Sequence, residues 1–459
     1  MSLLVQKYGG TSIGTAERLL NVAKIVQHSI EQGNRVAVVL SAMSSQVKLE
    51  GTTSRLVAAA EAAIAHGAYY KIIDLLEERH LEAIDKAIND RAIKEQVKQD
   101  VDAKFHKLKS FLDAIGVIGE ISPRSMDVII GMGEKLSARI FAAVLNDQGI
   151  DAIYCNLENL VDQPFTEVNN EFCLYLQTRL GEQVKAAGSR VTVFTGFLGF
   201  VPGGILKSIG RGYTDFTAAL VAAGAGAKEL QIWKEVDGIY STDPRKVKAA
   251  KVLASITPDE ALELTYYGSE VIHPFTMEQV SRAGVPVRIK NTFSPEVPGT
   301  FIDPNAEPNP LQKKPTAVTV KRNVTVLNIY SNRMLMAYGF MSRVFDILGR
   351  YEIIIDLIAT SEVNISLTID DTSNLDKATV ELEKLGRVSI KEQMAILSLV
   401  GQGMRNQPGV SGEMFSRIAT AGVNIELISQ GASEINISCV IDDEHADKAL
   451  KAVHEMLES

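Results

Sequence analysis

The chain has 459 residues, 46% of them hydrophobic and 22% charged, and its formal net charge is −9. This length predicts about two or three domains, and no apolar run is long enough to cross a bilayer, which excludes a membrane span. The acidic balance argues against a general nucleic-acid binder, so an anionic ligand would have to meet a local cluster of cations. The first residues reach a lysine and a glycine pair before the apolar core of a signal peptide could form, so the cytoplasm is the expected compartment.

The first part of the chain alternates strands with helices. "SLLVQKY" predicts a short strand that runs into a glycine turn and a helix, which Gly33 ends, and "RVAVVLSAM" predicts the next strand, which ends at Ser41. Residues 55–118 predict several helices set on the sheet domain. "SMDVIIGMGEKLSARIFAAVLNDQG" predicts a strand, a glycine turn and a helix, and "VTVFTGFLGF" and "ELQIWKEVDGIYS" predict further junctions of strand and loop. This order predicts a mostly parallel α/β sheet covered by helices, with ligands at the carboxyl ends of its strands.

The second part of the chain differs from the first in composition and contains an internal repeat. Prolines concentrate between Pro295 and Pro315 and mark a domain boundary. Beyond it, residues 345–371 resemble residues 415–443, and each copy reads helix, turn, strand, loop and alternating strand. This repeat predicts a tandem pair of small α+β modules rather than a solenoid. We expect a catalytic domain at 1–305, a linker and first strand at 306–320, and modules at 321–390 and 391–459. The strand at 316–321 could also belong to the second module.

The first glycine-rich loop suggests anion binding. Gly9, Gly10 and Gly14 follow a strand and precede a helix, so their backbone N–H groups could approach an anion beside the charge of Lys7. A tight structural turn explains these glycines equally well. The loop matches neither the Walker A motif nor the dinucleotide fingerprint.

The second glycine-rich loop, "GGILKSIGRGYTD", strengthens the phosphate interpretation. It brings Lys207 and Arg211 to the start of an apolar helix, where an arginine suits a carboxylate or a phosphate. Asp215 could orient a metal-bound nucleotide or the catalytic lysine. The motifs of hydrolases are absent from the sequence, so the pattern favours nucleotide-dependent phosphoryl transfer.

Several single residues keep two interpretations. Glu134 reads as a dipole-favoured residue in the first turn of a helix, or as a carboxylate that holds a substrate ammonium. Trp233 and Tyr240 fit core aromatics or the flanks of an adenine ring, and Arg245 fits a surface charge or a phosphate ligand. His273 belongs to no histidine cluster, so we expect packing there rather than ligation.

Taken together, "VQKYGGTS", "GEKLSAR", "GRGYTD", "VDGIYSTDPR", "YYGSEVIHP" and the final "GVNIELIS" resemble the aspartokinase family, in that family's order and over nearly the whole chain. The variants "GRGYTDFTAAL" and "KLEGTTSRL" are most similar to its fungal-type branch. The resemblance implies an α/β amino-acid-kinase fold, with a mostly parallel sheet sandwiched by helices, followed by two α+β ACT domains of the βαββαβ type. It also implies transfer of the ATP γ-phosphoryl group, with Mg²⁺ held mainly through the phosphates, to the side-chain carboxylate of L-aspartate. That reaction is the first step toward lysine, threonine and methionine.

The resemblance also implies roles by position. It gives catalysis to Lys7, Arg211 and Asp215. It gives aspartate binding to Ser41, Thr53, Glu134, Phe197, Arg211 and Thr214, and nucleotide binding to Lys7, Gly9, Gly10, Gly212, Lys234, Glu235, Tyr240 and Arg245. Because the acceptor carboxylate is already ionised at neutral pH, the reaction needs alignment and charge neutralisation more than a strong base.

The chain departs from the family pattern in three motifs. Tyr213 and Thr214 stand where many relatives have Gly-Ser, Lys234 and Glu235 where many have Thr-Asp, and Glu270 where many have a lysine. The charged residues of the expected catalytic centre are all retained, which favours an active enzyme.

The ACT domains imply regulation by an end-product amino acid, threonine before lysine. Backbone amides near Gly339 would take the effector carboxylate and Asp356 or Glu362 its ammonium, although both acids also fit solvated strand ends. The effector-binding residues that the resemblance implies are Met334, Gly339, Phe340, Asp356, Ser361 and Glu362. Pairing of ACT modules between chains predicts a homodimer or a dimer of dimers, without a nucleic-acid or membrane partner. Two other hypotheses stay open: an amino-acid sensor with a silent kinase-like domain, and a sister kinase with another acceptor.

Overall fold

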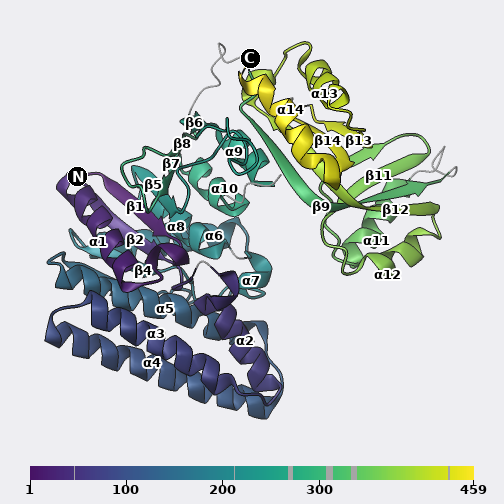
Figure 1. Cartoon of the computed structure of the whole chain (residues 1–459). Coiled ribbons are helices and arrows are strands. Elements are labelled where there is room, and N and C mark those ends of the chain that lie inside the picture. The colour runs from purple at the N-terminus through teal and green to yellow at the C-terminus, as the bar shows by residue number, and fades with distance from the viewer. Residues whose placement is uncertain are drawn as a thin grey trace. The chain divides into compact units, whose positions relative to one another are not determined.

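The computed structural model describes residues 1–45, 47–210, 212–266, 272–305, 314–331, 339–432 and 435–458. The chain folds into two compact units, which can be followed by colour in Figure 1. The first unit contains Met1–Ile239 and Ile272–Ala306, and the second contains Tyr240–Val271 and Glu307–Ser459. In the described part of the chain, no helix is long and apolar enough to cross a membrane.

The first unit is built on a mostly parallel sheet, which confirms the predicted fold class. Its strands lie in the order β3–β4–β2–β1–β5–β7–β8, and neighbouring strands are parallel except β7 and β8. All residues of β1 are buried, as expected for a strand that helices cover on both faces. The strands are β1 (Leu3–Tyr8), β2 (Arg35–Leu40), β3 (Ala152–Cys155), β4 (Val191–Thr195), β5 (Glu229–Lys234), β7 (Val287–Asn291) and β8 (Thr300–Ile302).

Helices cover this sheet, and some of them form a further layer. Figure 1 shows α2, α3 and α4 stacked beside α5, on the side away from the sheet. They correspond to the segment 55–118 that the sequence predicted as helical, and their apolar faces belong to one core cluster with α1 and α5. The helices are α1 (Ala16–Glu31), α2 (Thr52–Ile64), α3 (Tyr69–Ala87), α4 (Arg91–Ile118), α5 (Pro123–Asp147), α6 (Asn170–Ala186), α7 (Ile205–Ser208), α8 (Tyr213–Gly224) and α10 (Pro274–Arg282).

The strand predicted at the start of "SMDVIIGMGEK" is wrong, because Pro123–Asp147 forms one continuous helix, α5. The Ser122 hydroxyl caps it by accepting the Ser125 N–H at 3.1 Å, and proline occupies the first helical position. Residues 129–138 are buried without interruption. A helix buried on all sides loses the amphipathic period that separates helix from strand in a sequence.

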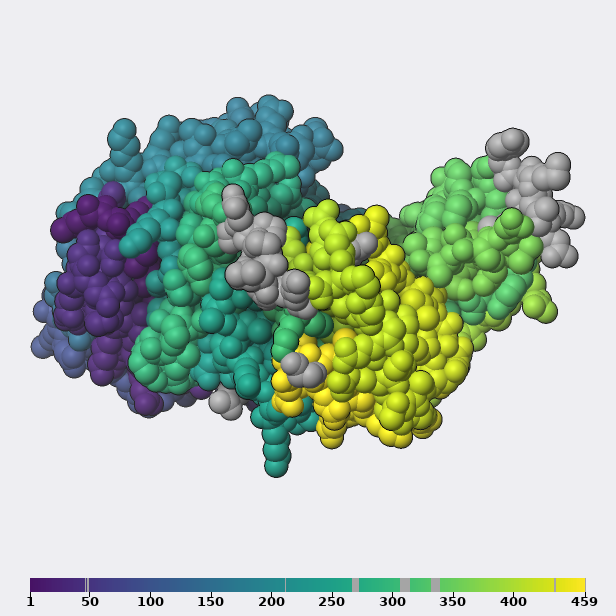
Figure 2. All heavy atoms as spheres, turned by 90° about the horizontal axis from the view of Figure 1, so that it is seen from above, coloured from purple at the N-terminus to yellow at the C-terminus, as the bar shows by residue number. Residues whose placement is uncertain are grey.

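The second unit is dominated by an antiparallel sheet in the order β10–β11–β9–β12–β14–β13. Helices α13 and α14 pack side by side in this unit, as the adjoining yellow-green and yellow spheres of Figure 2 show. The strands of this sheet are β9 (Ala317–Tyr330), β10 (Ile358–Thr360), β11 (Asn364–Ile369), β12 (Arg387–Val400), β13 (Leu427–Gln430) and β14 (Asn436–Asp442). The short strand β6 (Ser255–Ile256) is not part of this sheet. The helices are α9 (Pro258–Tyr266), α11 (Phe340–Arg350), α12 (Leu375–Leu382), α13 (Val410–Thr420) and α14 (Ala446–Glu458).

Two long strands are shared by the two repeats. The first half of β9, from Ala317 to Lys321, pairs with the second half of β12, whereas the second half of β9 pairs with β11 and the first half of β12. The register shifts between these halves, close to Asn323 and Gln393, which both have φ of 56°. The strand at 317–321 therefore runs beside the second repeat, and separate apolar clusters underlie the two repeats.

Residues 240–271 group with the second unit, although the sequence placed them in the catalytic domain. The Val318 N–H donates to the Ser241 carbonyl at 2.8 Å. The buried Glu260 carboxylate accepts from the Thr316 hydroxyl at 2.6 Å and from the Gln402 N–H at 2.8 Å. These bonds tie the segment to the start of β9 and the end of β12.

Candidate active site

A buried ion pair lies at the carboxyl edge of the sheet in the first unit. Lys7, near the end of β1, contacts Asp215, in the first turn of α8, with 2.6 Å between Nζ and Oδ1 and 9% exposure for each side chain. Burial alone would raise the pKa of Asp215, but the charges of Lys7 and of Lys234 outweigh it and hold that pKa below its usual range. The helix dipole of α8 also favours an anion at this position. The arrangement places both charges where parallel sheets bind their ligands.

The first glycine loop passes over this pair. The Gly9 N–H donates to the Trp233 carbonyl at 3.4 Å, and a Cβ on Gly9 would lie 3.9 Å from Lys7 Nζ. A Cβ on Gly10 would lie only 2.3 Å from the Ala42 carbonyl oxygen. Close packing therefore requires glycine at position 10, whereas Gly9 leaves room above the ammonium group.

The second glycine loop is shaped by its contact with α10. Gly210 has φ of 86°, and a Cβ on Gly212 would lie 2.6 Å from the His273 ring. His273 begins α10 by accepting the Phe275 N–H at Nδ1 over 3.3 Å, and burial lowers its pKa. The predicted packing role of His273 is thus visible as a contact with the loop. Arg211, between the two glycines, lies outside the described residues.

Glu134 is buried in the middle of α5 and not in its first turn, so the capping interpretation is wrong. Its Oε1 accepts from the Tyr213 hydroxyl at 2.6 Å and from the Ala42 N–H at 3.2 Å. Its Oε2 is buried and has no hydrogen-bond partner among the residues that the structure describes. Burial raises the pKa of Glu134 to about 7, against the hydrogen bonds from Tyr213 and Ala42. Such a carboxylate is suited to receive a cation.

Aromatic and hydroxyl side chains surround Glu134. The rings of Phe197 and Tyr213 meet edge to face, with 6.3 Å between centroids. Thr53 lies at the start of α2, close enough to Tyr213 to lower its pKa, although burial raises that pKa overall. Ser41 follows β2, and its carbonyl accepts the Ser137 hydroxyl at 2.7 Å. Thr214 is buried next to Asp215. Five of the residues predicted to bind aspartate therefore belong to this edge of the sheet, although they come from five separate segments of the chain: Ser41, Thr53, Glu134, Phe197 and Thr214.

Comparison with known proteins decides the family. Residues 2–291 match the model of the amino acid kinase family, and residues 327–384 and 397–457 match an ACT domain. The aspartokinase of Schizosaccharomyces pombe is 47% identical, over 99% of this chain and 92% of the relative. That of Saccharomyces cerevisiae is 42% identical, over 99% and 92%. The chain belongs to the aspartokinase family.

Solved structures agree with this assignment. Escherichia coli aspartokinase III in complex with aspartate and ADP superimposes with a TM-score of 0.81 at 28% identity, and both chains are covered completely. The same enzyme in complex with lysine and aspartate gives a TM-score of 0.78. The predicted family, fold class and enzyme class are confirmed. The chain is an aspartate kinase, an enzyme that phosphorylates aspartate with ATP.

The predicted nucleotide-binding positions of this aspartokinase divide between the two units. Lys234 ends β5 in the first unit and is followed by the exposed Glu235. Tyr240 and Arg245 belong to the second unit, where the exposed Arg245 pairs with Asp243 at 2.9 Å. Glu270 lies outside the described residues. The predicted nucleotide-binding residues that lie near the sheet edge of the first unit are Lys7, Gly9, Gly10, Gly212 and Lys234.

The predicted effector positions lie around α11 and β10 of the second unit. Gly339 has φ of 78° and precedes α11, whose first residue, Phe340, is buried. Asp356 binds Lys321 at 2.7 Å, and its other oxygen is buried without a partner among the described residues. Ser361 and Glu362 are exposed after β10, and Met334 falls outside the described part of the chain.

Sequence reasoning missed Asp127 and the inward position of Tyr213. Asp127 accepts the Ile205 N–H at 3.0 Å on each carboxylate oxygen and so holds the start of α7 in the second glycine loop. Burial raises its pKa to about 6. Its place two helical turns before Glu134, on the same face of α5, is the signal that could have revealed it.

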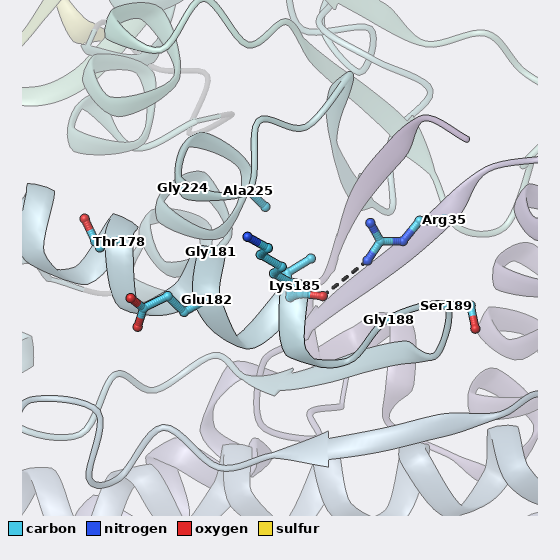
Figure 3. Close-up of a pocket in the computed structure, with 10 residues that line it drawn as sticks. Arg35, Thr178, Gly181, Glu182, Lys185, Gly188, Ser189, Gly224 and Ala225 are labelled. Atoms are coloured by element: carbon cyan, nitrogen blue, oxygen red, sulfur yellow. Dashed lines mark hydrogen bonds between the residues drawn. The ribbon is translucent and has the colours of Figure 1, made fainter.

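A separate hollow of about 740 Å³ lies at the other end of the sheet. Figure 3 shows residues that line it, among them Glu182 and Lys185 of α6 and Arg35, the first residue of β2. The Arg35 guanidinium already donates to the Val184 carbonyl at 3.2 Å. Because ligands of open parallel sheets bind at the carboxyl ends of the strands, we assign this hollow no part in catalysis.

Proposed function

We propose that this aspartokinase binds the phosphates of ATP beside Lys7 and the ammonium group of aspartate beside Glu134. The observation that carries the proposal is the start of α8. There, Asp215 contacts Lys7 at 2.6 Å, and Tyr213, two residues earlier, contacts Glu134 at 2.6 Å. One helix start thus joins the two subsites and fixes their separation.

The proposed chemistry follows from these charges. An oxygen of the aspartate side-chain carboxylate attacks the γ-phosphorus, the bond from phosphorus to the β,γ-bridging oxygen breaks, and ADP leaves with that electron pair. The Lys7 ammonium neutralises charge on the phosphoryl oxygens, and Asp215 holds the ammonium in place. Arg211 is proposed to bind the carboxylate at the α-carbon, with Ser41 and Thr53 as hydroxyl donors.

Magnesium fits this site as an ion carried by the nucleotide. The described residues contain no group of three His, Cys, Asp or Glu side chains that could hold a metal, and Asp215 already shares its charge with Lys7. We propose that Mg²⁺ would be held mainly by phosphate oxygens, with Asp215 as a carboxylate that could help to hold it, and that it would supply further charge neutralisation. Lys234, Glu235, Tyr240 and Arg245 stay predictions for the adenosine part of the nucleotide.

Regulation by an end-product amino acid is also part of the proposal. The lysine complex of the Escherichia coli relative and the ACT repeats of this chain support an amino-acid effector, for which the sequence favours threonine before lysine. Asp356, with a buried oxygen that has no described partner, is the strongest candidate for its ammonium group. Assembly as a homodimer or a dimer of dimers and a cytoplasmic location stay predictions of the sequence.

The proposal can be tested by trapping the product with hydroxylamine. Wild-type protein with ATP, Mg²⁺ and aspartate should form aspartyl hydroxamate, and Lys7→Ala should lower the rate by about 10²- to 10³-fold, the usual effect of losing one charge-stabilising group. Lys86→Ala is the matched control, because Lys86 is an exposed lysine paired with Glu82 on α3. Equal rates for the two variants would overturn the role of Lys7. Hydroxamate formed only with another carboxylate would indicate a different acceptor.

A further inference from the structure

Tyr213 is buried between the aspartate pocket and the phosphate loop. It is the first residue of α8, only 4% exposed, and its ring packs on Phe197. Its hydroxyl donates to Glu134 at 2.6 Å. Because a buried phenol needs a hydrogen-bond partner, this contact fixes the side chain in its inward position.

The two oxygens of Glu134 have different surroundings. Oε1 receives both described donors, the Tyr213 hydroxyl and the Ala42 N–H, while Oε2 is buried and has no partner among the described residues. A buried carboxylate oxygen without a donor is costly, so Oε2 is the oxygen that a substrate ammonium would satisfy. The hydrogen bonds to Oε1 fix the orientation of the carboxylate and thereby the position of Oε2.

Burial keeps the Tyr213 phenol in its neutral form, because it raises the pKa of this group well above its usual value. The phenol therefore has a proton to donate, and the structure places it on Glu134 Oε1. This hydrogen bond joins α8 to α5.

We propose that Tyr213 is a positioning residue for aspartate, whose hydroxyl holds one oxygen of Glu134 so that the other receives the substrate ammonium. The proposal rests on the role proposed above for Glu134. Because Asp215 follows two residues later and contacts Lys7, the same helical turn sets the distance from the substrate ammonium to the phosphoryl group. Tyr213 therefore aligns the acceptor without touching the reacting atoms.

The test replaces Tyr213 with phenylalanine, which keeps the ring and removes the hydroxyl. We expect the KM for aspartate to rise about tenfold to a hundredfold, the usual effect of losing a hydrogen bond to a charged group, with the KM for ATP within about twofold of wild type. The Tyr213 hydrogen bond lowers the pKa of Glu134, so the acidic limb of kcat/KM for aspartate should move to higher pH in Tyr213→Phe. An unchanged KM for aspartate and an unmoved acidic limb would overturn the proposal.

Control variants separate this proposal from the one on which it rests. Tyr154→Phe removes another buried hydroxyl of the first unit, one without a hydrogen-bond partner in the described part of the chain, and should leave both KM values near wild type. If Glu134→Gln binds aspartate as tightly as wild type, the role of Glu134 itself is wrong. If Glu134→Gln weakens aspartate binding but Tyr213→Phe does not, only the role of Tyr213 is wrong.

A double variant tests whether Tyr213 acts through Glu134. In the Glu134→Gln background, Tyr213→Phe should change the KM for aspartate by less than about twofold, because coupled residues are not additive. The full loss in that background would show that Tyr213 acts independently and would overturn the proposal. Should Tyr213→Phe fail to fold, 3-fluorotyrosine at position 213 preserves the packing and strengthens the donor, which should move the acidic limb to lower pH. An unmoved limb would again contradict the proposal.

Discussion

At the scale of single residues, the site works by placing charges in a buried environment. Lys7 and Asp215 form a buried ion pair, in which the charge of Lys7 helps to hold the pKa of Asp215 below its usual range. Glu134 is buried with two hydrogen-bond donors and without a described cationic partner at either oxygen. Breaking a buried pair leaves an uncompensated charge and is strongly destabilising. In the function proposed above, the two acids therefore have different tasks: Asp215 holds the cation of Lys7, and Glu134 binds the ammonium group of the substrate.

The state of Glu134 predicts a pH dependence of stability. Burial raises its pKa to about 7 in the folded protein, against 4.5 for an unperturbed glutamate carboxyl. The unfolded chain therefore loses this proton first, and the free energy of unfolding falls as the pH rises through that window. Glu134→Gln removes this contribution, so the Tm of the variant minus that of wild type should increase between about pH 4.5 and pH 7. Thermal unfolding without substrate measures it, and a constant difference would contradict the burial of an ionisable Glu134.

At the scale of the elements, the sequence predicted β1, β2, β4 and β5 because their apolar runs end at glycine or polar loops. It failed at α5, where burial on all sides removed the helical period. It also left open the roles of Glu134 and Tyr213, because the contact between them joins residues 79 positions apart in the chain. Periodicity reports on local structure, whereas such a contact depends on how α5 and α8 pack.

The second glycine loop predicts a steric effect. Gly212 has φ of −81°, which alanine accepts, but the added Cβ would lie 2.6 Å from the His273 ring. We expect Gly212→Ala to lower the free energy of unfolding by about 1–3 kcal/mol through overpacking. Chemical denaturation measures this change. In the His273→Ala background the same substitution should cost much less, and an equal cost in both backgrounds would refute the contact as its cause.

At the scale of the whole molecule, the regulatory repeats are interleaved rather than consecutive. The two long strands β9 and β12 each pair with strands of both repeats. The sequence, taken in chain order, suggested such sharing only for the strand at 316–321. Lys321 lies on the half of β9 that pairs beside the second repeat and contacts Asp356, which precedes β10 of the first. An effector ammonium bound at the second oxygen of Asp356 would therefore share this carboxylate with an ion pair that connects the two repeats.

This arrangement predicts the effect of Asp356→Asn. Losing the carboxylate removes the ammonium ligand proposed for the effector, so inhibition by threonine or lysine should weaken by about tenfold or more, as for other hydrogen bonds to charged groups. The activity without effector should stay near wild type. Titration of the hydroxamate assay with each amino acid measures the change, and Asp371→Asn, at an exposed acid of the same unit, is the control. Inhibition unchanged in Asp356→Asn would place the effector elsewhere.

The central claim is that one edge of the first unit holds both the phosphates beside Lys7 and the aspartate ammonium beside Glu134. A crystal structure of the protein with aspartate, ADP and Mg²⁺ tests it most directly. We expect the aspartate nitrogen within about 3 Å of Glu134 Oε2, and a phosphate oxygen within about 3 Å of Lys7 Nζ. Aspartate bound with its nitrogen away from Glu134, or phosphates bound away from Lys7, would contradict it.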